Sequence, residues 1–292
     1  MKILVTGGAG FIGSALVSRL KARGHTVVVA DIRESQNSEV ESRSVNILEL
    51  EQVKGSLKGV DLVYHLAGPV LEFCRRNPYE ASLLQMTGTL NVLEACRLQK
   101  VSKVILASSF YVYDGLPESM IVNEASPLDI TRMELFGAIK FMAEKLVQTY
   151  AAKYGLEYVI LRFGSAYGLG DCSNVVKTFL EAGLRAEPIE VWGKGLRRNQ
   201  YTYVEDIAEG CVLALDRRNE IYNLISPEET TTGDLARLLQ RKFGFDVVFN
   251  EAYPEGPSMP YMSSRKAIQQ LGWSPTSLEE AVEKMARIVR SK

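Results

Sequence analysis

Three glycines near the start of the chain have the spacing needed to hold a phosphate group. Gly7, Gly10 and Gly13 lie in the run TGGAGFIG, between a short apolar segment and an amphipathic one. Glycines at these positions allow a tight turn, close approach of the backbone to a ligand, and close packing of the following helix. Because N–H groups at a helix N-terminus bind anions, the run predicts a pyrophosphate site.

A carboxylate follows at the position expected for a ribose-binding residue. Asp31 ends the next apolar segment, 18 residues after Gly13. A carboxylate there accepts hydrogen bonds from both ribose hydroxyls and repels a 2′-phosphate. We therefore expect NAD as the cofactor. NADP is the less favoured choice, and it stays open because Arg33, two residues after Asp31, could pair with the additional phosphate. The alternative without a cofactor is a glycine turn followed by an exposed loop aspartate.

The elements that must position these residues alternate in type along the first two thirds of the chain. Short runs that are apolar on both faces predict buried parallel strands. These runs are Ile3–Thr6, Thr26–Ala30, Leu62–Leu66, Val104–Ala107 and Tyr158–Arg162. Amphipathic segments predict helices over Gly13–Arg23, Tyr79–Leu98 and Leu135–Lys153. This alternation predicts an α/β fold with a doubly wound parallel sheet.

The pattern becomes less regular after Arg162, which indicates a second domain. We expect residues 1–165 to form the first domain, with elements near 189–216 returning to it. Residues 166–292 should form mainly a smaller α+β lobe. Its expected segments are Val175–Ala186, Ile189–Gly195, Asn223–Ile225, Thr232–Phe243, Asp246–Asn250 and a closing helix at Leu278–Arg290.

Composition and charge narrow the class of protein. The chain has 292 residues and a formal net charge of −1. A nearly neutral chain has no bulk attraction to nucleic acid or to an anionic membrane. No apolar run reaches the ~20 residues that span a bilayer, and the first residues leave no room for a secretion signal. The widely spaced Cys74, Cys96, Cys172 and Cys211 predict reduced, mostly buried thiols rather than a metal site. We expect a cytoplasmic protein.

Further motifs extend the pattern over essentially the whole chain. They are HLAG at 65–68, TGTLNVLEA at 87–95, Ser108-Ser109 before Val112-Tyr113, Arg162 with Tyr167-Gly168, YVED at 203–206 and LGWSP at 271–275. With the glycine run and Asp31, they resemble the extended short-chain dehydrogenase/reductase family, and within it the nucleotide-sugar 4-epimerases. The resemblance implies a Rossmann sheet, NAD, a nucleotide-diphosphate sugar as substrate, and a homodimer formed through the helices Tyr79–Leu98 and Leu135–Lys153.

The resemblance also assigns residues to the cofactor. The pyrophosphate would contact Gly7, Gly10, Phe11, Ile12 and Gly13. The adenosine ribose would contact Asp31 and Ile32, and the adenine would contact Asn46 and Ile47. The nicotinamide would lie beside Leu66, Ala67 and Gly68, and its ribose would bind Lys140. His65 is expected to be a packed residue at the end of a strand rather than a catalyst.

One catalytic position departs from the family. Members use a tyrosine as the general acid/base, with a lysine four residues later that lowers its pKa and a Ser or Thr hydroxyl that holds the same oxygen. Lys140 and Ser109 match, but Phe136 stands where the tyrosine should be. Phenylalanine cannot exchange a proton, and loss of a general acid/base slows a reaction by roughly 10²–10⁴-fold, or about 3–5 kcal/mol of barrier.

Three explanations of Phe136 remain open from the sequence. The residue could be an engineered Tyr→Phe change that traps a bound substrate. The proton carrier could have moved to Tyr111, two residues after Ser109. The chain could also be a binding or regulatory protein without turnover. Tyr111 and Tyr113 could equally be packing aromatics.

The substrate residues follow from the same resemblance. Ser109-Phe110-Tyr111 lacks the acidic residues that dehydratases and decarboxylases place there, so epimerisation or keto-reduction fits better than elimination. Candidates for the substrate site are Ser109, Ser165, Asn174, Val175, Trp192, and Arg198 or its neighbour Arg197, with an arginine for the diphosphate. Alternatives are core packing for Trp192 and a solvated basic turn for the arginines. Gln85 and Ser165 each replace an asparagine common in the family.

Overall fold

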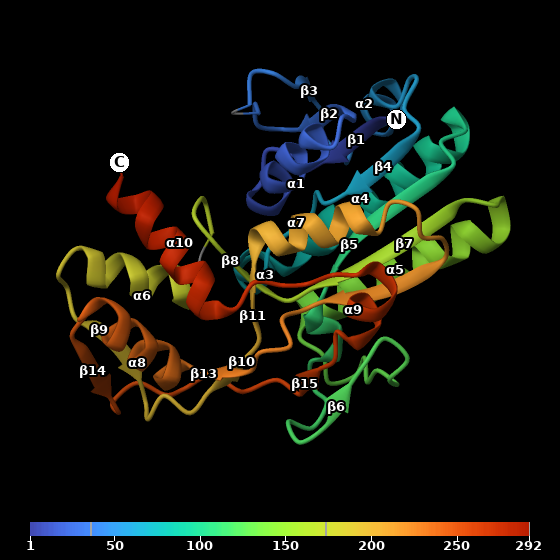
Figure 1. Cartoon of the computed structure of the whole chain (residues 1–292). Helices are drawn as coiled ribbons and strands as arrows, with labels where there is room; N and C mark the ends of the chain where they lie inside the picture. Colours follow the sequence, from blue (N-terminus) through green and yellow to red (C-terminus); the bar gives the residue numbers. More distant parts are fainter. Residues whose placement is uncertain (36, 173, 292) are drawn as a thin grey trace.

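A seven-stranded parallel sheet forms the centre of the computed structural model, which describes residues 1–35, 37–172 and 174–291. The strand order is β12-β7-β5-β4-β1-β2-β3, so the chain winds outwards from β1 in both directions (Figure 1). The strands are β1 (Lys2–Thr6), β2 (Thr26–Asp31), β3 (Glu41–Ser44), β4 (Leu62–His65), β5 (Lys103–Ser109), β7 (Glu157–Phe163) and β12 (Glu220–Leu224). Ligands of such sheets bind beyond the carboxyl ends of the strands, near the point where the order reverses.

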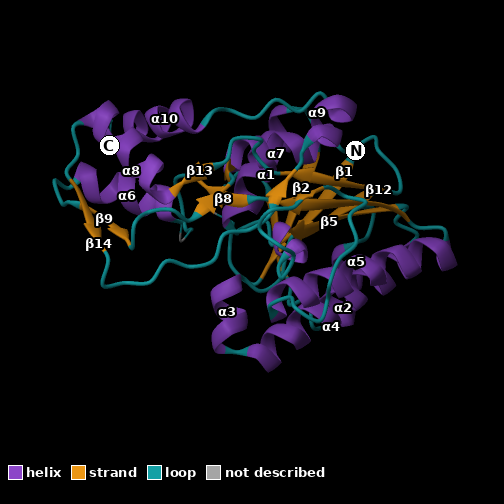
Figure 2. Cartoon of the chain, turned by 90° about the horizontal axis from the view of Figure 1, so that it is seen from below, coloured by secondary structure: helices purple, strands orange, loops and turns teal. Residues whose placement is uncertain are grey.

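Helices cover both faces of the sheet (Figure 2). On one face lie α1 (Phe11–Ala22), α7 (Val204–Leu213) and α9 (Arg265–Leu271); on the other lie α2 (Leu50–Ser56), α4 (Pro78–Gln99) and α5 (Leu135–Tyr154). Two buried clusters, one under each layer, account for the apolar strands. Within the described residues, no helix is both long and apolar enough to cross a membrane.

A smaller lobe lies beyond the carboxyl ends of the strands (left in Figure 1). It contains β8 (Ser165–Tyr167), α6 (Val175–Leu184), β9 (Ile189–Trp192), β10 (Arg198–Asn199), β11 (Tyr201–Tyr203), β13 (Thr230–Thr231), α8 (Thr232–Phe243), β14 (Val247–Asn250) and α10 (Leu278–Arg290). Its apolar side chains form their own buried cluster. Four short elements complete the fold: α3 (Leu71–Arg76), the 3₁₀ helix η1 (Phe110–Tyr113), and the paired strands β6 (Ile121–Val122) and β15 (Tyr261–Met262). Side chains of η1, β6 and β15 share a small buried cluster.

The sheet topology corrects one prediction about an individual element and refines another. The segment Asn223–Ile225 was expected in the smaller lobe, but β12 pairs in parallel with β7 at the edge of the main sheet. Of the range 189–216, expected to contain elements that return to the first domain, β9 pairs with β14 within the lobe, whereas α7 packs on α1. Elements from beyond residue 165 therefore serve both lobes, and a division at that residue stays a prediction.

Candidate active site

The glycine run forms a tight turn between β1 and α1. Gly7 has a φ of 71°, and a Cβ added there would lie 2.7 Å from the backbone nitrogen of Ala67. A Cβ on Gly13 would clash with the carbonyl oxygen of Gly7. Gly10 has no side chain with which to cap the N-terminus of α1, so the first N–H groups of the helix are available to an anion. The turn therefore has the shape and the donors of a phosphate cradle.

The two apolar residues of the turn do not direct their side chains to that cradle. Phe11 packs against the loop of the smaller lobe, since a Cβ on Gly168 or Gly170 would lie 3.3 Å from its ring. Ile12 packs against the clusters of both lobes. Any contact of Phe11 or Ile12 with a pyrophosphate must therefore come from the backbone.

Asp31 is a buried residue held in place by the turn. Its side chain is 8% exposed and accepts hydrogen bonds from the backbone N–H of Ala9 at 3.1 Å and of Arg33 at 3.0 Å. The alternative of an exposed loop aspartate is therefore wrong. The Arg33 side chain lies near Gly10 and forms an ion pair with Asp171 at 3.5 Å. Ile32 is exposed beside them.

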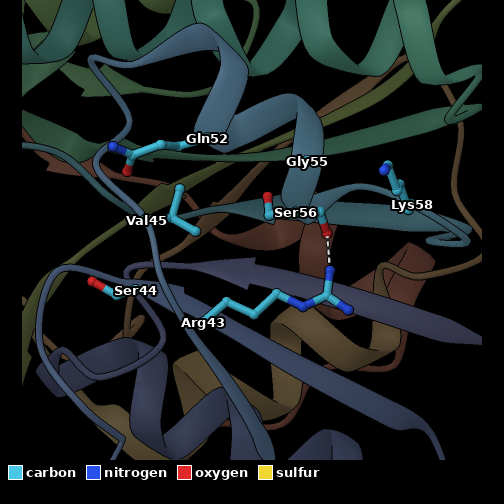
Figure 3. Close-up of a pocket in the computed structure, with 7 residues that line it drawn as sticks. All are labelled: Arg43, Ser44, Val45, Gln52, Gly55, Ser56 and Lys58. Carbon is cyan, nitrogen blue, oxygen red and sulfur yellow. Dashed lines mark hydrogen bonds between the residues drawn. The ribbon is translucent and has the colours of Figure 1, made fainter.

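The loop expected to meet adenine is anchored to the sheet. The Asn46 Oδ1 accepts a hydrogen bond from the N–H of Leu48, and buried Ile47 packs against Gly88 of α4. Behind this loop lies a cavity of about 320 Å³ (Figure 3). It is lined by Arg43, Ser44, Val45, Gln52, Gly55, Ser56 and Lys58, with the Arg43 guanidinium bonded to the Ser56 carbonyl. None of these residues is a candidate for catalysis.

The segment after β4 forms the wall expected beside the nicotinamide. Leu66 and Ala67 donate backbone N–H groups to the carbonyl and hydroxyl oxygens of Thr6, which fixes the wall against β1. His65 is buried and hydrogen-bonded to Thr6 and Thr89. Burial, and secondarily the charge of Lys140, lowers the pKa of His65 to about 3. The expectation that His65 is a packed residue is confirmed.

A buried acceptor without a partner lies beside this wall. Gln85 of α4 is 1% exposed, and its Nε2 donates to the Thr89 hydroxyl at 3.1 Å. Its Oε1 has no hydrogen-bond partner among the described residues and lies against Gly68, close to Lys140. Because an unpaired buried acceptor is unfavourable, this oxygen fits a site completed by a bound group.

Phe136 and Lys140 lie one turn apart on α5. The Phe136 ring packs against Cys74, Ala81 and Ile139, and the Lys140 Nζ lies 5.8 Å from the centre of that ring. The Lys140 side chain is buried and donates to the Ala107 carbonyl at 3.3 Å. Burial lowers its pKa to about 8, although Cys74 and Glu144 act to raise it.

Ser109, at the end of β5, and Tyr111, in η1, follow each other closely in the chain, and Tyr111 reaches the Phe136 ring. The Tyr111 ring meets the Phe136 ring edge to face at 5.4 Å. Burial raises the Tyr111 pKa, and the charges of Arg197 and Arg75 offset this in part. The Ser109 Oγ caps η1 by accepting the N–H of Tyr111 at 3.2 Å. Three of the four predicted catalytic residues, Tyr111, Phe136 and Lys140, are therefore brought together, and Ser109 contacts the backbone of Tyr111.

A buried polar network, which the sequence did not identify as a unit, supports these residues. Arg162 binds Glu144 through Nε at 2.9 Å and Nη2 at 2.8 Å, and binds the Tyr113 hydroxyl at 2.8 Å. Glu144 also accepts from Ser108 at 2.5 Å, and Tyr113 donates to Asn223 at 2.9 Å. The signal available in the sequence was the spacing of Glu144, four residues after Lys140 on one helix face.

The two arginines of the smaller lobe differ in their surroundings. Arg198 lies between Glu118 at 3.6 Å and Glu229 at 3.5 Å. The Arg197 guanidinium donates to the Pro257 carbonyl and has no carboxylate partner within the described ranges. Its charge also acts to lower the Tyr111 pKa, so the guanidinium lies within electrostatic range of Tyr111. Arg197 is therefore the cation left unneutralised beside the candidate site.

The remaining substrate candidates lie on the lobe's surface and at the start of α6. Trp192 is 55% exposed and stacks on Tyr253 at 5.2 Å, so the core-packing alternative is wrong. Asn174 caps α6 by accepting the N–H of Val176, and donates to the Ala166 carbonyl and the Ser165 hydroxyl. Val175 packs into the lobe's core. The Asn174 side chain is thus already committed to holding this turn.

Comparisons with known proteins identify similar sequences and structures. A model of the NAD dependent epimerase/dehydratase family matches residues 3–224. UDP-glucose 4-epimerase from Thermotoga maritima, solved with UDP-glucose, is 30% identical with a TM-score of 0.90 over 100% of this chain and 99% of that one. The UDP-glucose 4-epimerase of Thermus thermophilus, solved with NAD, is 29% identical with a TM-score of 0.88 over 99% of both chains. UDP-glucuronic acid decarboxylase 2 from Arabidopsis thaliana is 29% identical over 100% of this chain and 69% of that protein.

Proposed function

The chain belongs to the NAD-dependent epimerase/dehydratase family, and from this premise we propose that it is a nucleotide-sugar epimerase acting at one sugar carbon. The proposal is carried by one observation: the Lys140 amine lies over the ring of residue 136 and close to Gly68, the wall expected to face the nicotinamide. Tyr111, which neighbours Ser109, packs on the same ring. Bound NAD would supply a reversible acceptor for the hydrogen and electron pair of the sugar carbon.

The residues present fit this cofactor. The N-terminus of α1, which has no capping side chain, would hold the pyrophosphate, and Asp31 would bind the adenosine ribose. Lys140 and the unpaired Gln85 Oε1 would bind at the nicotinamide end. The buried carboxylate of Asp31 favours NAD over NADP, because a 2′-phosphate there would meet a negative charge.

For the nucleotide, the geometry favours Arg197 over Arg198 as the diphosphate ligand. Two carboxylates already neutralise Arg198, whereas the Arg197 guanidinium has no carboxylate partner among the described residues and lies within electrostatic range of Tyr111. A charge-assisted bond to a phosphate is stronger when the cation has no competing carboxylate. The exposed stack of Trp192 and Tyr253 offers an aromatic surface for the base.

Epimerisation is favoured over decarboxylation or elimination by the residues after Ser109. Phe110 is buried and Tyr111 is half-buried, and neither carries the acidic group that elimination needs at this place. Tyr111 is the nearest hydroxyl-bearing replacement for residue 136, but burial raises its pKa and so makes it reluctant to ionise.

The active form would be a homodimer formed through α4 and α5. Both helices lie on the outer side of one sheet face (Figure 2). They expose apolar side chains: Tyr79, Leu83 and Leu90 on α4, and Leu135 and Met142 on α5. Apolar side chains that recur on adjacent helices are typical of a face covered by another chain.

The test of the function is conversion of nucleotide-diphosphate sugars, with the sugar configuration followed by NMR. UDP-glucose and UDP-glucuronic acid come first, because proteins similar to this chain bind or are named for them. The native protein and Phe136→Tyr are compared. Conversion by either protein supports an epimerase, whereas tight binding without conversion by both would indicate a binding protein.

A further inference from the structure

The proposed epimerisation needs a group that accepts a proton from the sugar hydroxyl and later returns it. Phe136 has no hydroxyl for this purpose. Resting on the proposed function, we infer that Lys140 itself takes over this role and is the proton carrier of the reaction. In this scheme Lys140 is a catalytic base and acid as well as a ligand of the cofactor ribose.

The position of the Lys140 amine supports this role. The Nζ lies over the Phe136 ring, 5.8 Å from its centre. A Cβ added to Gly68 would lie only 3.5 Å from Nζ. The amine's only hydrogen bond within the described part of the chain, to the Ala107 carbonyl, is long at 3.3 Å. The amine thus lies close to both residue 136 and the wall, with donor capacity to spare.

The surroundings favour a readily titrated amine. The side chain is buried, and charge in an apolar setting is unfavourable, which lowers the pKa to about 8. The titratable groups that face it are Cys74 on α3, Glu144 on α5 and His65 on β4. Cys74 and Glu144 favour the ammonium form, while His65 stays neutral because its pKa falls to about 3.

Tyr111 is the weaker candidate for the same step. Its ring packs edge to face on Phe136, but its pKa is raised rather than lowered. A general base works best when its pKa lies near the working pH. Lys140 satisfies this condition, and Tyr111 does not.

The step balances without any additional reactant. As the sugar carbon gives its hydrogen and bonding electron pair to the cofactor, the O–H bond breaks and its proton moves to the lone pair of Nζ, directly or through one water. This forms a keto sugar and an ammonium group. When the carbon regains the hydrogen on its other face, the ammonium returns the proton to oxygen. The net change is inversion at one carbon.

The first measurement of this inference does not depend on activity. In protein labelled with ¹³C at lysine Cε, an NMR titration reports the pKa of Lys140, with Lys140→Met identifying its signal. The expected pKa is about 8, instead of the ordinary 10.5. A Lys140 that titrates at its ordinary value would overturn the inference, because the amine would then be protonated at every working pH.

The second measurement distinguishes the effect of the Lys140 charge on cofactor binding from its effect on proton transfer. Lys140→Arg keeps a cation for the ribose but cannot act as a base at neutral pH. It should bind NAD within about threefold of the native protein, while conversion falls at least ~100-fold. Lys145→Arg, an exposed change on the same helix, should retain native conversion. Native conversion by Lys140→Arg, or its loss only in Tyr111→Phe, would assign the proton to another group.

The pH dependence has a definite sign. Only the neutral amine accepts a proton, so conversion should rise about tenfold per pH unit below the pKa of Lys140 and level off above about 8. If Phe136→Tyr converts sugars but the native protein does not at pH 9, the proposed function stands and Lys140 is excluded. If neither protein converts any sugar, the proposed function itself fails, and this role of Lys140 fails with it.

Discussion

At the scale of single residues, the proposed chemistry depends on residue 136 and on two cations. Phe136 has a ring that packs against Cys74 and Ile139, so the absence of a hydroxyl there would affect proton transfer far more than packing. Lys140 keeps its place beside the nicotinamide wall. The second cation, Arg197, should control affinity for the nucleotide rather than the rate of the chemical step.

We predict that Arg197→Ala weakens binding of UDP by about 10–100-fold, because a charge-assisted hydrogen bond contributes about 1.5–3 kcal/mol. Arg198→Ala is the matched control and should change the affinity less than about threefold, since Glu118 and Glu229 already neutralise that side chain. Isothermal titration calorimetry with UDP measures both. A larger effect of Arg198→Ala than of Arg197→Ala would reverse the assignment.

At the scale of elements, α5 connects the catalytic face to the buried network. Lys140 and Glu144 are one turn apart on this helix, and Glu144 binds Arg162 on β7 and Ser108 on β5. The helix is therefore fixed to the carboxyl ends of two strands, next to Ser109.

We predict that Glu144→Gln lowers the free energy of unfolding by about 3–5 kcal/mol, because it leaves the Arg162 charge buried and uncompensated. Arg76→Gln is the control: its ion pair with Glu72 is exposed, so the loss should be below ~1 kcal/mol. Urea unfolding measures both. A loss of less than about 1 kcal/mol for Glu144→Gln would show that the network is not a structural support.

Helices and strands with a strong local pattern of apolar residues could be predicted from the sequence, whereas strands without such a pattern could not. The five apolar strands and the helix that carries Lys140 follow from periodicity alone. The edge strands β3 (ESRS) and β12 (EIYNL) begin with polar residues, so they lack the continuous apolar run that identified the central strands. Their place in the sheet is set by pairing with distant residues, which periodicity does not contain.

In the candidate site, too, local motifs could be predicted from the sequence, whereas contacts between distant residues could not. The glycine turn, Asp31, Ser109 and Lys140 stand in local motifs, so their positions could be predicted. The choice between Arg197 and Arg198 depends on Glu118 and Glu229, which approach from other parts of the chain. The unpaired oxygen of Gln85 likewise becomes visible only when α4 packs beside Gly68.

At the scale of the whole molecule, the two lobes share residues from the cofactor turn. Phe11 and Ile12 begin α1 yet pack into the core of the smaller lobe. Cofactor binding at this turn should therefore influence how the substrate lobe is held. The opposite side of the sheet, with its exposed apolar residues on α4 and α5, is free to meet a second chain.

We predict that the protein is a dimer and that the double change Leu83→Glu and Met142→Glu makes it monomeric, because charges would be buried in the proposed interface. Val248→Glu, at an exposed apolar residue of β14, is the control and should leave the dimer intact. Light scattering coupled to size-exclusion chromatography gives the masses. A native protein that elutes as a monomer at micromolar concentration would contradict the proposal.

The most direct test of the account is the ratio of conversion rates between Phe136→Tyr and the native protein on the same nucleotide sugar. Restoring the hydroxyl one turn before Lys140 should accelerate epimerisation by less than the roughly 10²–10⁴-fold that a general acid/base contributes, because Lys140 already carries the proton in the native protein, with little change in NAD affinity. Absence of conversion by Phe136→Tyr across UDP-, TDP-, CDP- and GDP-sugars, despite bound NAD, would contradict it.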